Sequence, residues 1–331
     1  MNSTRLFDGI YQISSPLGDR VLYQYLLSGN RSLLVDTGTC ETPAKTTIPF
    51  IESIGLRKDN LTVAINTHCD ADHFGGNSEL RRLAPRTLLA AHREDREQIE
   101  DPDLTMKIRY NAFSADHGIE YAPEVKSSLR AMMGDRCGLD ILLQGGEVFQ
   151  LSDDWGVEIL HVPGHSHGHI AIWDPRNKAV MIGDAVMGRY IPTADGRPAL
   201  APTYMYPDEY MSTIRLIRQL RPETLLTSHY PSMNREQAQK FLDESAIFAR
   251  EADHQILKAL RGTNEPLTLR ELIVKTAENL TPIPENVRMD LAFPFAGHLT
   301  RLEKLGKIHR ARKGGLVAWR IVRRPRKRRR I

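Results

Sequence analysis

Hydrophobic and polar positions alternate along the first ninety residues in short runs that predict β-strands separated by turns. Three β-rich runs, Gly9–Ile13, Val21–Leu27 and Ser32–Val35, come first, and glycine-containing turns separate them. The largely apolar run Leu61–Asn66 predicts a further strand, and a helix at Ser78–Leu83 precedes the next strand at Thr87–Ala91. Alternation of strands and helices predicts an α/β fold.

The pattern becomes helical after this first sheet and then returns to strands. Residues 92–142 hold helical periodicity with few strand signals, which predicts a helical insertion. Strands resume within residues 148–182, and a helix at Asp208–Leu220 leads to one more strand at Leu225–Thr227. An earlier segment, Pro43–Ile54, predicts a helix that Pro49 would kink or delay.

The chain beyond residue 235 predicts a small second domain. Helical patterns cover Arg235–Ala259, Thr268–Ala277 and Ala296–Leu305, and two strands around Gly314-Gly315 predict a hairpin. Three helices followed by a hairpin predict a winged-helix-like domain. The predicted organisation is therefore a domain of residues 1–235 containing the 92–142 insertion, a C-terminal domain of 236–322, and a basic tail of 323–331.

Charge is distributed unevenly between the body and the end of the chain. The formal net charge of the 331 residues is +4, yet residues 301–331 alone carry 14 Lys and Arg against one acid. Residues 323–330 are basic apart from Pro325, and such a run is a candidate contact for nucleic acid or an anionic surface. A solubilising extension is the equally weighted alternative. We do not favour a nucleic-acid partner.

Composition limits the cellular setting that the sequence predicts. No apolar run reaches the ~18 residues of a membrane span, and the N-terminus lacks the apolar stretch of a signal peptide. The three cysteines are an odd number without paired spacing, so a disulfide framework is not expected. We therefore predict a cytoplasmic protein with no membrane span.

Candidate metal ligands gather where predicted strands end. The segment His68-Cys69-Asp70-Ala71-Asp72-His73 offers four imidazole or carboxylate ligands in six residues. Further candidates follow later strands, with His165 among several histidines, Asp184 after Ile182-Gly183, and His229 after Thr227-Ser228. Because α/β folds gather their sites at the carboxyl ends of strands, we expect these side chains to meet.

The order of these segments, from Val35-Asp36-Thr37-Gly38 to Ser228-His229, resembles that of the metallo-β-lactamase-fold hydrolases. The resemblance covers about residues 8–235 and implies an αββα sandwich with a dinuclear metal site at its edge. It implies a first ion on His68, Asp70 and His165, a second on Asp72, His73 and His229, and Asp184 bridging both. Asp72 and Asp184 are then the catalytic residues. The family's pattern also implies that Asp36 supports the loop.

Several neighbouring residues carry a weaker expectation. His169 matches a family position that is normally structural, and we expect packing or surface roles for His161 and His167. Cys69 occupies a variable position and is not expected to bind metal. Four tyrosines near the last segments are candidate donors to an oxyanion, although packing is the favoured role for each: Tyr190, Tyr204, Tyr206 and Tyr230.

Asp70 departs from the family pattern, which has histidine at this position. An extra carboxylate lowers the positive charge of the site and shifts its preference from zinc towards iron or manganese. Zinc remains the first expectation for the two divalent ions. Flavodiiron proteins resemble this arrangement because they use a carboxylate at the same position, although this chain has no flavodoxin-like region.

Three functions are compatible with these features. The leading hypothesis is a metal-dependent hydrolase of a small ester, thioester or lactone, which uses a bridging hydroxide and resembles glyoxalase II-like and lactonase-like members. The alternatives are a di-iron oxidoreductase, motivated by Asp70, and a nuclease, motivated by the basic tail. The predicted partner is a small-molecule substrate, and a homodimer is left open.

Overall fold

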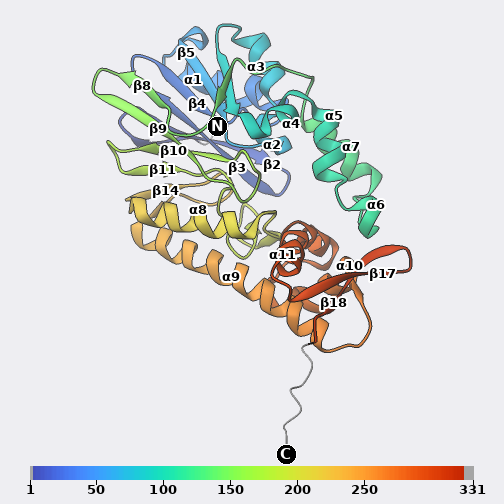
Figure 1. Ribbon diagram of the computed structural model, residues 1–331. Coiled ribbons are helices and arrows are strands. Elements are labelled where there is room, and N and C mark those ends of the chain that lie inside the picture. Colours follow the sequence, from blue (N-terminus) through green and yellow to red (C-terminus); the bar gives the residue numbers. More distant parts are fainter. Residues whose placement is uncertain (1–2, 324–331) are drawn as a thin grey trace, which may run out of the picture.

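Two β-sheets pack face to face in the computed structural model, which describes residues 3–323 (Figure 1). The first sheet has seven strands in chain order: β1 (Ser3–Phe7), β2 (Ile10–Leu17), β3 (Arg20–Ser28), β4 (Ser32–Val35), β5 (Leu61–Asn66), β6 (Leu88–His92) and β7 (Ile141–Leu143). Pairing is antiparallel from β1 to β4 and parallel from β4 to β7.

The second sheet has six strands that also follow chain order, with a crossover connection at one strand pair. The strands lie in the order β15 (Met233–Asn234), β14 (Thr224–Leu226), β11 (Ala179–Met181), β10 (Ile170–Asp174), β9 (Trp155–His161) and β8 (Val148–Ser152). The β11–β14 pair, which the crossover joins, is parallel and the other pairs are antiparallel. Apolar side chains from both sheets fill the space between them, among them Tyr25, Ile65, Val157 and Ile172, which are almost fully buried.

Helices cover the outer face of each sheet, so the predicted αββα sandwich is confirmed (Figure 1). The first sheet is covered by α1 (Ile48–Ser53) and α3 (Asn77–Leu83), and the second by α8 (Pro207–Leu220) and the first half of α9 (Arg235–Arg261). The helix predicted over Pro43–Ile54 begins as a π-helical turn, Pro43–Thr47, and becomes α1 before Pro49. Pro49 is tolerated because the first helical turn needs no N–H donor at that position.

Residues between β6 and β7 form short helices, as the helical pattern predicts. They are α4 (Arg96–Glu100), α5 (Pro102–Thr105), a π-helical segment (Met106–Tyr110), α6 (Ser114–His117) and α7 (Pro123–Met132). This insertion reaches the C-terminal helices, where the Phe113 ring meets Phe293 at a centroid distance of 5.1 Å and Tyr121 donates a hydrogen bond to Asp290. The insertion and the C-terminal region therefore share a contact over one side of the sandwich.

The described C-terminal region contains three α-helices, two short 3-10 helices (Ala277–Asn279 and Glu285–Leu291) and a three-stranded sheet. The second half of α9 packs against α10 (Leu269–Thr276) and α11 (Ala292–Lys304), and the sheet has the order β16 (Leu267–Thr268), β18 (Leu316–Ile321), β17 (Ile308–Lys313). Thr268 and Glu271 form the reciprocal capping box that their spacing predicts. Because the 27-residue α9 packs on both parts, the boundary at residue 235 and the winged-helix assignment stay predictions.

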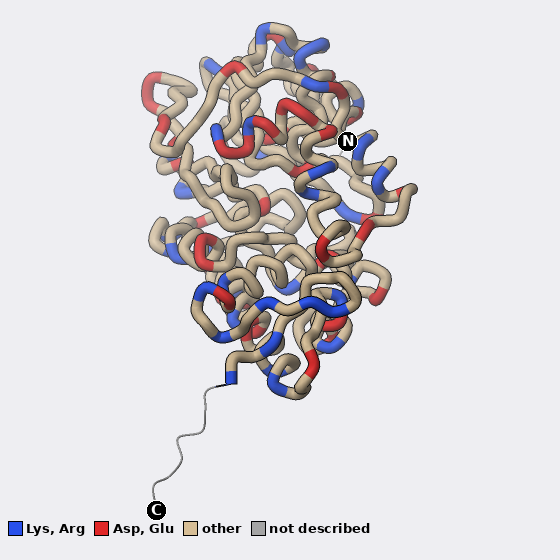
Figure 2. Tube along the Cα trace, turned by 45° about the vertical axis from the view of Figure 1, so that its right-hand side comes forward, with Lys and Arg blue, Asp and Glu red and all other residues tan. Residues whose placement is uncertain are grey.

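Basic positions are frequent on the C-terminal helices and hairpin (Figure 2). Several are paired with acids nearby, including Arg301 with Asp208 and Asp253, and Lys313 with Glu271. Residues 324–331, which hold most of the predicted basic tail, lie outside the described residues. Within residues 3–323, no helix is long and apolar enough to cross a bilayer.

Candidate metal centre

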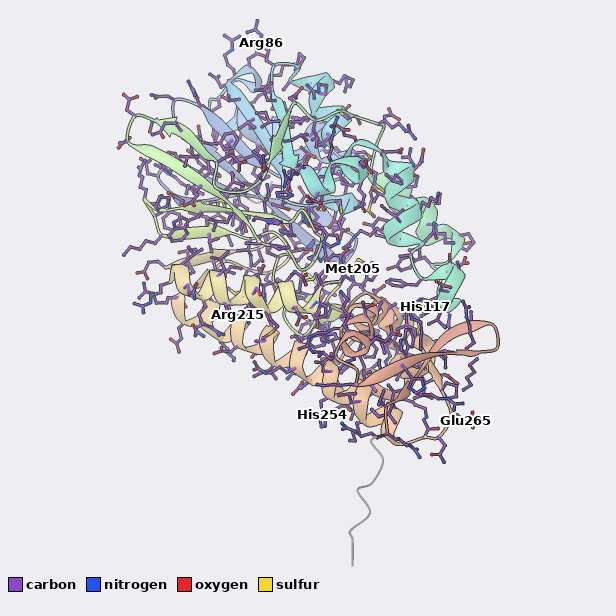
Figure 3. The ribbon with its side chains drawn as sticks, in the orientation of Figure 1. Arg86, His117, Met205, Arg215, His254 and Glu265 are labelled. Atoms are coloured by element: carbon purple, nitrogen blue, oxygen red, sulfur yellow. The ribbon has the colours of Figure 1, made fainter. Side chains whose placement is uncertain are left out.

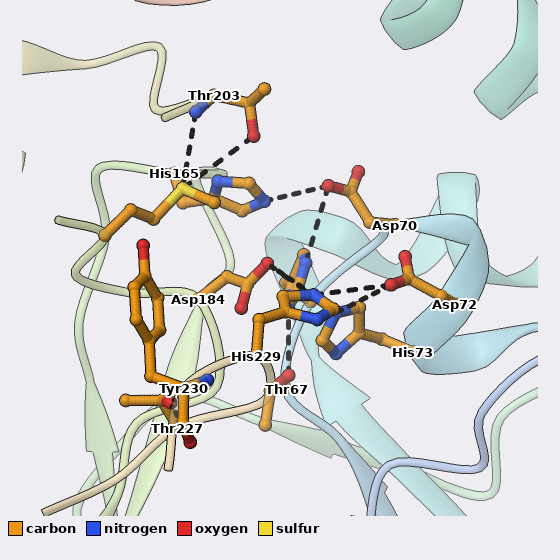
Figure 4. Close-up of polar contacts among 12 residues, drawn as sticks. Thr67, Asp70, Asp72, His73, His165, Asp184, Thr203, Thr227, His229 and Tyr230 are labelled. Atoms are coloured by element: carbon orange, nitrogen blue, oxygen red, sulfur yellow. Dashed lines mark hydrogen bonds and ion pairs between the residues drawn. The ribbon is translucent and has the colours of Figure 1, made fainter. Parts of the chain in front are cut away.

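The seven predicted ligands meet at one edge of the sandwich, where strands of both sheets end (Figure 4). The loop after β5 and the short helix α2 (Ala71–Phe74) bring four of them, and the segments after β9, β11 and β14 bring one each. Three overlapping groups have ligand atoms within 4.8 Å of one another: His68 with Asp70 and His165, His68 with His73 and Asp184, and Asp72 with His73 and His229. Five of the seven are almost completely buried: His68, His73, His165, Asp184 and His229.

Distances around His229 have the size expected between neighbouring ligands of one ion. His229 Nε2 lies 3.4 Å from Asp72 Oδ2 and 3.3 Å from Asp184 Oδ2. His73 Nε2 lies 3.8 Å and 3.7 Å from the same two oxygens. With bonds of about 2.0–2.2 Å in tetrahedral geometry, neighbouring ligand atoms are about 3.3–3.5 Å apart. These four residues, called the His229 half below, therefore fit a divalent ion.

Hydrogen bonds at Nδ1 orient three of the histidines towards this centre. His73 Nδ1 donates to Asp36 Oδ2 at 2.9 Å, and His229 Nδ1 donates to the Val21 carbonyl at 3.2 Å. His68 Nδ1 lies 3.0 Å from the Thr67 hydroxyl, which itself hydrogen-bonds to Asp36. Proton donation from Nδ1 leaves the lone pair on Nε2, as metal-binding histidines require.

Two of these histidines have a ring nitrogen that the protein's own groups, within residues 3–323, do not satisfy. Nε2 of His68 and Nε2 of His73 are buried and have no hydrogen-bond partner among the described residues. A buried lone pair without a partner is costly, and a metal ion would satisfy both atoms. The residues of the site therefore fit the divalent ion that the sequence predicts.

Asp184 is held by the turn that precedes it. Gly183 adopts a φ of 53°, and a Cβ there would come within 2.9 Å of the Thr67 hydroxyl oxygen, so this tight approach requires glycine. The backbone N–H of Asp184 donates to His169 Nε2, while His169 Nδ1 contacts the Ile170 carbonyl. Because both its nitrogens are engaged, His169 positions Asp184 and offers no lone pair to a metal.

The remaining ligands, His68, Asp70 and His165, form what we call the His165 half, and a buried arginine enters it. Arg109, from the π-helical segment, pairs with both carboxylate oxygens of Asp70, and its Nη2 lies 2.8 Å from Asp70 Oδ2. The same nitrogen lies 2.9 Å from His165 Nε2. His165 Nε2 is also 2.9 Å from Asp70 Oδ2, whereas His165 Nδ1 is buried without a partner among the described residues.

The electrostatics of the two halves differ in consequence. In the His229 half, burial alone would lower the pKa of His73. The carboxylates of Asp36, Asp72 and Asp184 outweigh this effect and raise the pKa above its usual value, so a positive charge is favoured there. In the His165 half, burial would raise the pKa of Asp70, but Arg109 and His165 hold it well below its usual range. A protein cation already compensates that carboxylate.

Asp95 holds the loop that carries His165, and sequence reasoning missed both it and Arg109. Asp95 accepts hydrogen bonds from the Ser166 hydroxyl at 2.5 Å and from the Gly168 N–H at 2.8 Å. Both missed residues lie in or near the 92–142 region, where a buried charge has the same local pattern as an exposed one. Their role depends on how the insertion folds back over the His68–His73 loop.

The other candidates from the sequence have structural contacts. His161 stacks on His92 at a centroid distance of 4.2 Å, and His167 stacks on Tyr206 at 3.8 Å. Cys69 is buried, belongs to none of the ligand groups, and burial raises the pKa of its thiol. The hydroxyls of Tyr204 and Tyr230 are engaged with His298 and with backbone groups, which agrees with packing roles for both.

A cavity of about 540 Å³ opens beside His229. Its walls come from the start of β3, the loop of residues 188–196, the segment after β14, and α9. Aromatic side chains form much of the lining: Tyr23, Tyr190, Tyr230 and Phe241. The cavity is large enough for a small organic substrate, and His229 is the member of the His229 half that lines it.

An αββα sandwich with a His- and Asp-rich edge defines a class of metal-binding proteins, and comparison with known proteins identifies the family. The sequence profile of the metallo-beta-lactamase superfamily matches residues 17–229, which is more than half of the chain. The chain therefore belongs to the metallo-β-lactamase superfamily.

Relatives with assigned activities match part of the chain. A hydroxyacylglutathione hydrolase of Prochlorococcus marinus is 28% identical over 178 residues, covering 52% of this chain and 51% of the relative. An acyl-coenzyme A thioesterase of Bos taurus is 25% identical over 193 residues, covering 55% of this chain and 64% of the relative. The matches therefore span between half and two thirds of the length of these relatives.

Solved structures resemble nearly the whole chain at the level of the fold. A metallo-beta-lactamase family protein of Thermus thermophilus superposes with a TM-score of 0.72 and 19% identity, covering 96% of this chain and all of that chain. A beta-lactamase domain protein of Burkholderia ambifaria gives a TM-score of 0.75 at 15% identity, covering 97% and 94%. The C-terminal region is thus included in both superpositions.

Proposed function

We propose that this chain is a metal-dependent hydrolase that cleaves a small thioester. The observation that carries the proposal is the His229 half, in which His73 Nε2 lacks a partner among the described residues and two carboxylates face the same point as His229. The relatives add the bond type, because a hydroxyacylglutathione hydrolase and an acyl-coenzyme A thioesterase both act on thioesters. An ester or lactone is the nearest alternative.

Residues of the chain have distinct roles in this proposal. A divalent ion would be held by His73, His229, Asp72 and Asp184. Zinc is the first expectation for this ion, and iron and manganese are the alternatives. Such an ion polarises a carbonyl oxygen and lowers the pKa of water. Asp72 is the more accessible of the two carboxylates, with 17% of its side chain exposed against 6% for Asp184, so Asp72 is placed to accept the proton of the attacking water.

The cavity beside His229 supplies a place for the acyl group. Its aromatic lining would bury an apolar acyl chain and exclude water from that side of the carbonyl. The finer expectation from the sequence, two ions that share a hydroxide, remains a prediction. Arg109 bears on it directly because it contacts two of the three ligands assigned to the first ion.

The other functions considered from the sequence gain no specific support. Asp70 motivated a di-iron oxidoreductase, but its carboxylate is bound by Arg109. The basic tail motivated a nuclease, but most of that segment lies outside the described residues.

Thiol release from a panel of thioesters tests the proposal. The purified protein, loaded with zinc, would be assayed with hydroxyacylglutathione and acyl-coenzyme A substrates, and with esters and lactones of the same acyl groups. We expect turnover of at least one thioester by the native chain and none by Asp184→Ala, with both proteins equally folded by circular dichroism. Turnover of only esters or lactones, or equal rates for Asp184→Ala, would contradict it.

A further inference from the structure

Arg109 occupies the space between two ligands of the His165 half. Its side chain is 4% exposed, so the guanidinium is isolated from solvent. Nε and Nη2 pair with the two oxygens of Asp70, the second N–H of Nη2 faces His165 Nε2, and Nη1 donates to the Met205 sulfur at 3.5 Å. Each nitrogen of the Arg109 guanidinium thus has a partner, and its Nη2 contacts atoms of two residues, Asp70 and His165, that the family pattern assigns to a metal ion.

Because of the chemistry of imidazole, His165 Nε2 cannot make these contacts and bind a metal ion at the same time. An imidazole nitrogen has either a hydrogen or one lone pair. If His165 Nε2 carries the lone pair, the N–H of Arg109 uses it; if Nε2 carries a hydrogen, it donates to Asp70 and has no lone pair. In both tautomers His165 Nε2 is unavailable to a metal while Arg109 remains in place.

Several contacts hold Arg109 where it lies. Its guanidinium stacks over the Phe293 ring of α11 at 5.2 Å, and the next residue, Tyr110, accepts a hydrogen bond from the Ala71 N–H at 3.0 Å. Figure 3 shows Met205 between the sandwich and the C-terminal helices. The insertion, the ligand loop and the C-terminal region therefore all contribute to fixing this cation.

Formal charge favours one ion together with Arg109. The centre contains three carboxylates, Asp70, Asp72 and Asp184, whose negative charges one divalent ion and one guanidinium balance. Two divalent ions in addition to Arg109 would leave two positive charges in a buried site before hydroxide binds, and one after, which is electrostatically costly. His68 Nε2, which has no partner among the described residues, is within 4.8 Å of the ligand atoms of His73 and Asp184 and can join the single ion.

We propose that the Arg109 guanidinium takes the place of the first metal ion and that the centre binds a single divalent ion in the His229 half. The proposal rests on metal binding in the proposed function but not on the identity of the substrate. Arg109 then acts as a fixed cation next to the ion, a role that the sequence pattern does not indicate.

Metal stoichiometry tests this directly. The full-length protein would be stripped with a chelator, dialysed against a small excess of free Zn²⁺, and its zinc measured by mass spectrometry against protein concentration. We expect one equivalent for the native chain, one for Arg109→Lys, and two for Arg109→Met, in which Asp70 and His165 become free. Arg215→Met is the matched control, because the Arg215 side chain is exposed on α8 and its one side-chain hydrogen bond among the described residues is to Ser212.

Each outcome of the zinc measurement either supports or overturns the proposal of a single ion. Two equivalents in the native chain, or a single equivalent in a folded Arg109→Met, would overturn the proposal. If Arg109→Met does not fold, Asp70→Asn replaces it, and its zinc content should stay at one equivalent. Thioester turnover with two zinc ions would refute this inference alone, whereas one zinc ion without thioester turnover would refute the proposed substrate alone.

Discussion

The two halves of the metal centre contain the same kinds of ligands, yet they differ in what compensates them. In the His229 half, imidazole Nδ1 atoms donate to protein acceptors and leave Nε2 directed at two carboxylates. In the His165 half, Nε2 of the imidazole already faces a guanidinium and a carboxylate. A ligand pattern in sequence therefore gives the number of candidate atoms but not how many of them are free.

The comparison also shows where such a difference originates. Arg109 is 39 residues from Asp70 and 56 from His165, and it reaches both from the helical insertion. The insertion is in turn covered by α11, whose Phe293 lies against Arg109. Variation in an insertion outside the ligand loops can thus change the metal content of a site whose ligands are unchanged.

Replacing one histidine in each half should give the largest contrast. His229→Ala is expected to lose the ion and at least about 10³-fold in kcat/KM, because several kcal/mol of electrostatic stabilisation depend on it. His165→Ala should retain one equivalent of zinc. Zinc analysis after dialysis, together with thioester turnover, measures both; equal loss of zinc in the two variants would remove the distinction between the halves.

Residues that orient the ligands should show the same asymmetry with a smaller effect. Asp36 accepts hydrogen bonds from His73 Nδ1 and from Thr67, so Asp36→Asn should weaken zinc affinity about 10–100-fold. Asp95→Asn, which changes the acceptor of the hydrogen bonds from Ser166 and Gly168 in the loop of His165, should change it by less than about threefold on the same reasoning. Competition with a chromogenic chelator gives both affinities, and comparable losses would argue that His165 binds the ion.

The convergence of the candidate ligands could be predicted from the sequence because each follows an apolar run, and the ends of those strands meet in the fold. His68, Asp184 and His229 all lie two or three residues beyond β5, β11 and β14. Arg109 was not accessible, because Lys107 and Arg109 have the same local helical pattern although the first is exposed and the second buried. Only the tertiary position of the insertion separates them.

The sequence did not predict the start of one helix or the presence of several short strands. α11 begins at Ala292, before the predicted Ala296, because Pro294 lies in the first helical turn, where its missing N–H has no consequence. Five strands that the sequence does not predict have only two or three residues, too few for an alternating pattern: β7, β12 (Ile191–Pro192), β13 (Pro198–Leu200), β15 and β16. Their formation depends on neighbours that the chain brings together only in the tertiary structure.

The position of the cavity predicts that substrate binds on the side of the His229 half. Tyr190→Ala removes an aromatic wall and should raise KM about tenfold for the longer acyl chains, the size expected for lost apolar contact. Tyr206→Ala, on the side of the His165 half where Tyr206 stacks on His167, should leave KM within about threefold. An equal or larger rise in KM for Tyr206→Ala would relocate the substrate to the other half.

Asp290 should affect the stability of the contact between the helical insertion and the C-terminal region without affecting the metal centre. Burial raises its pKa from 3.8 to about 6, although the Tyr121 hydroxyl and the charge of Arg20 act in the opposite direction. The folded protein therefore favours the protonated acid, so this contribution to stability is full below pH 3.8 and is lost as the pH rises through about 6. Ionised Asp290 then costs the fold up to about 3 kcal/mol near neutral pH.

Asp290→Asn keeps an acceptor for Tyr121 and cannot ionise, so it isolates that cost. We expect the variant to have a higher free energy of unfolding in urea than the native chain at pH 7.5, by at most about 3 kcal/mol, and a smaller excess of about 1 kcal/mol at pH 4.5. Zinc content and turnover should be unchanged, because Asp290 contacts the insertion through Tyr121 and none of the ligands. A change in zinc content would mean that ionisation of Asp290 alters the position of the insertion and therefore of Arg109. Arg109 could then no longer be regarded as a fixed cation that is independent of the bound ion.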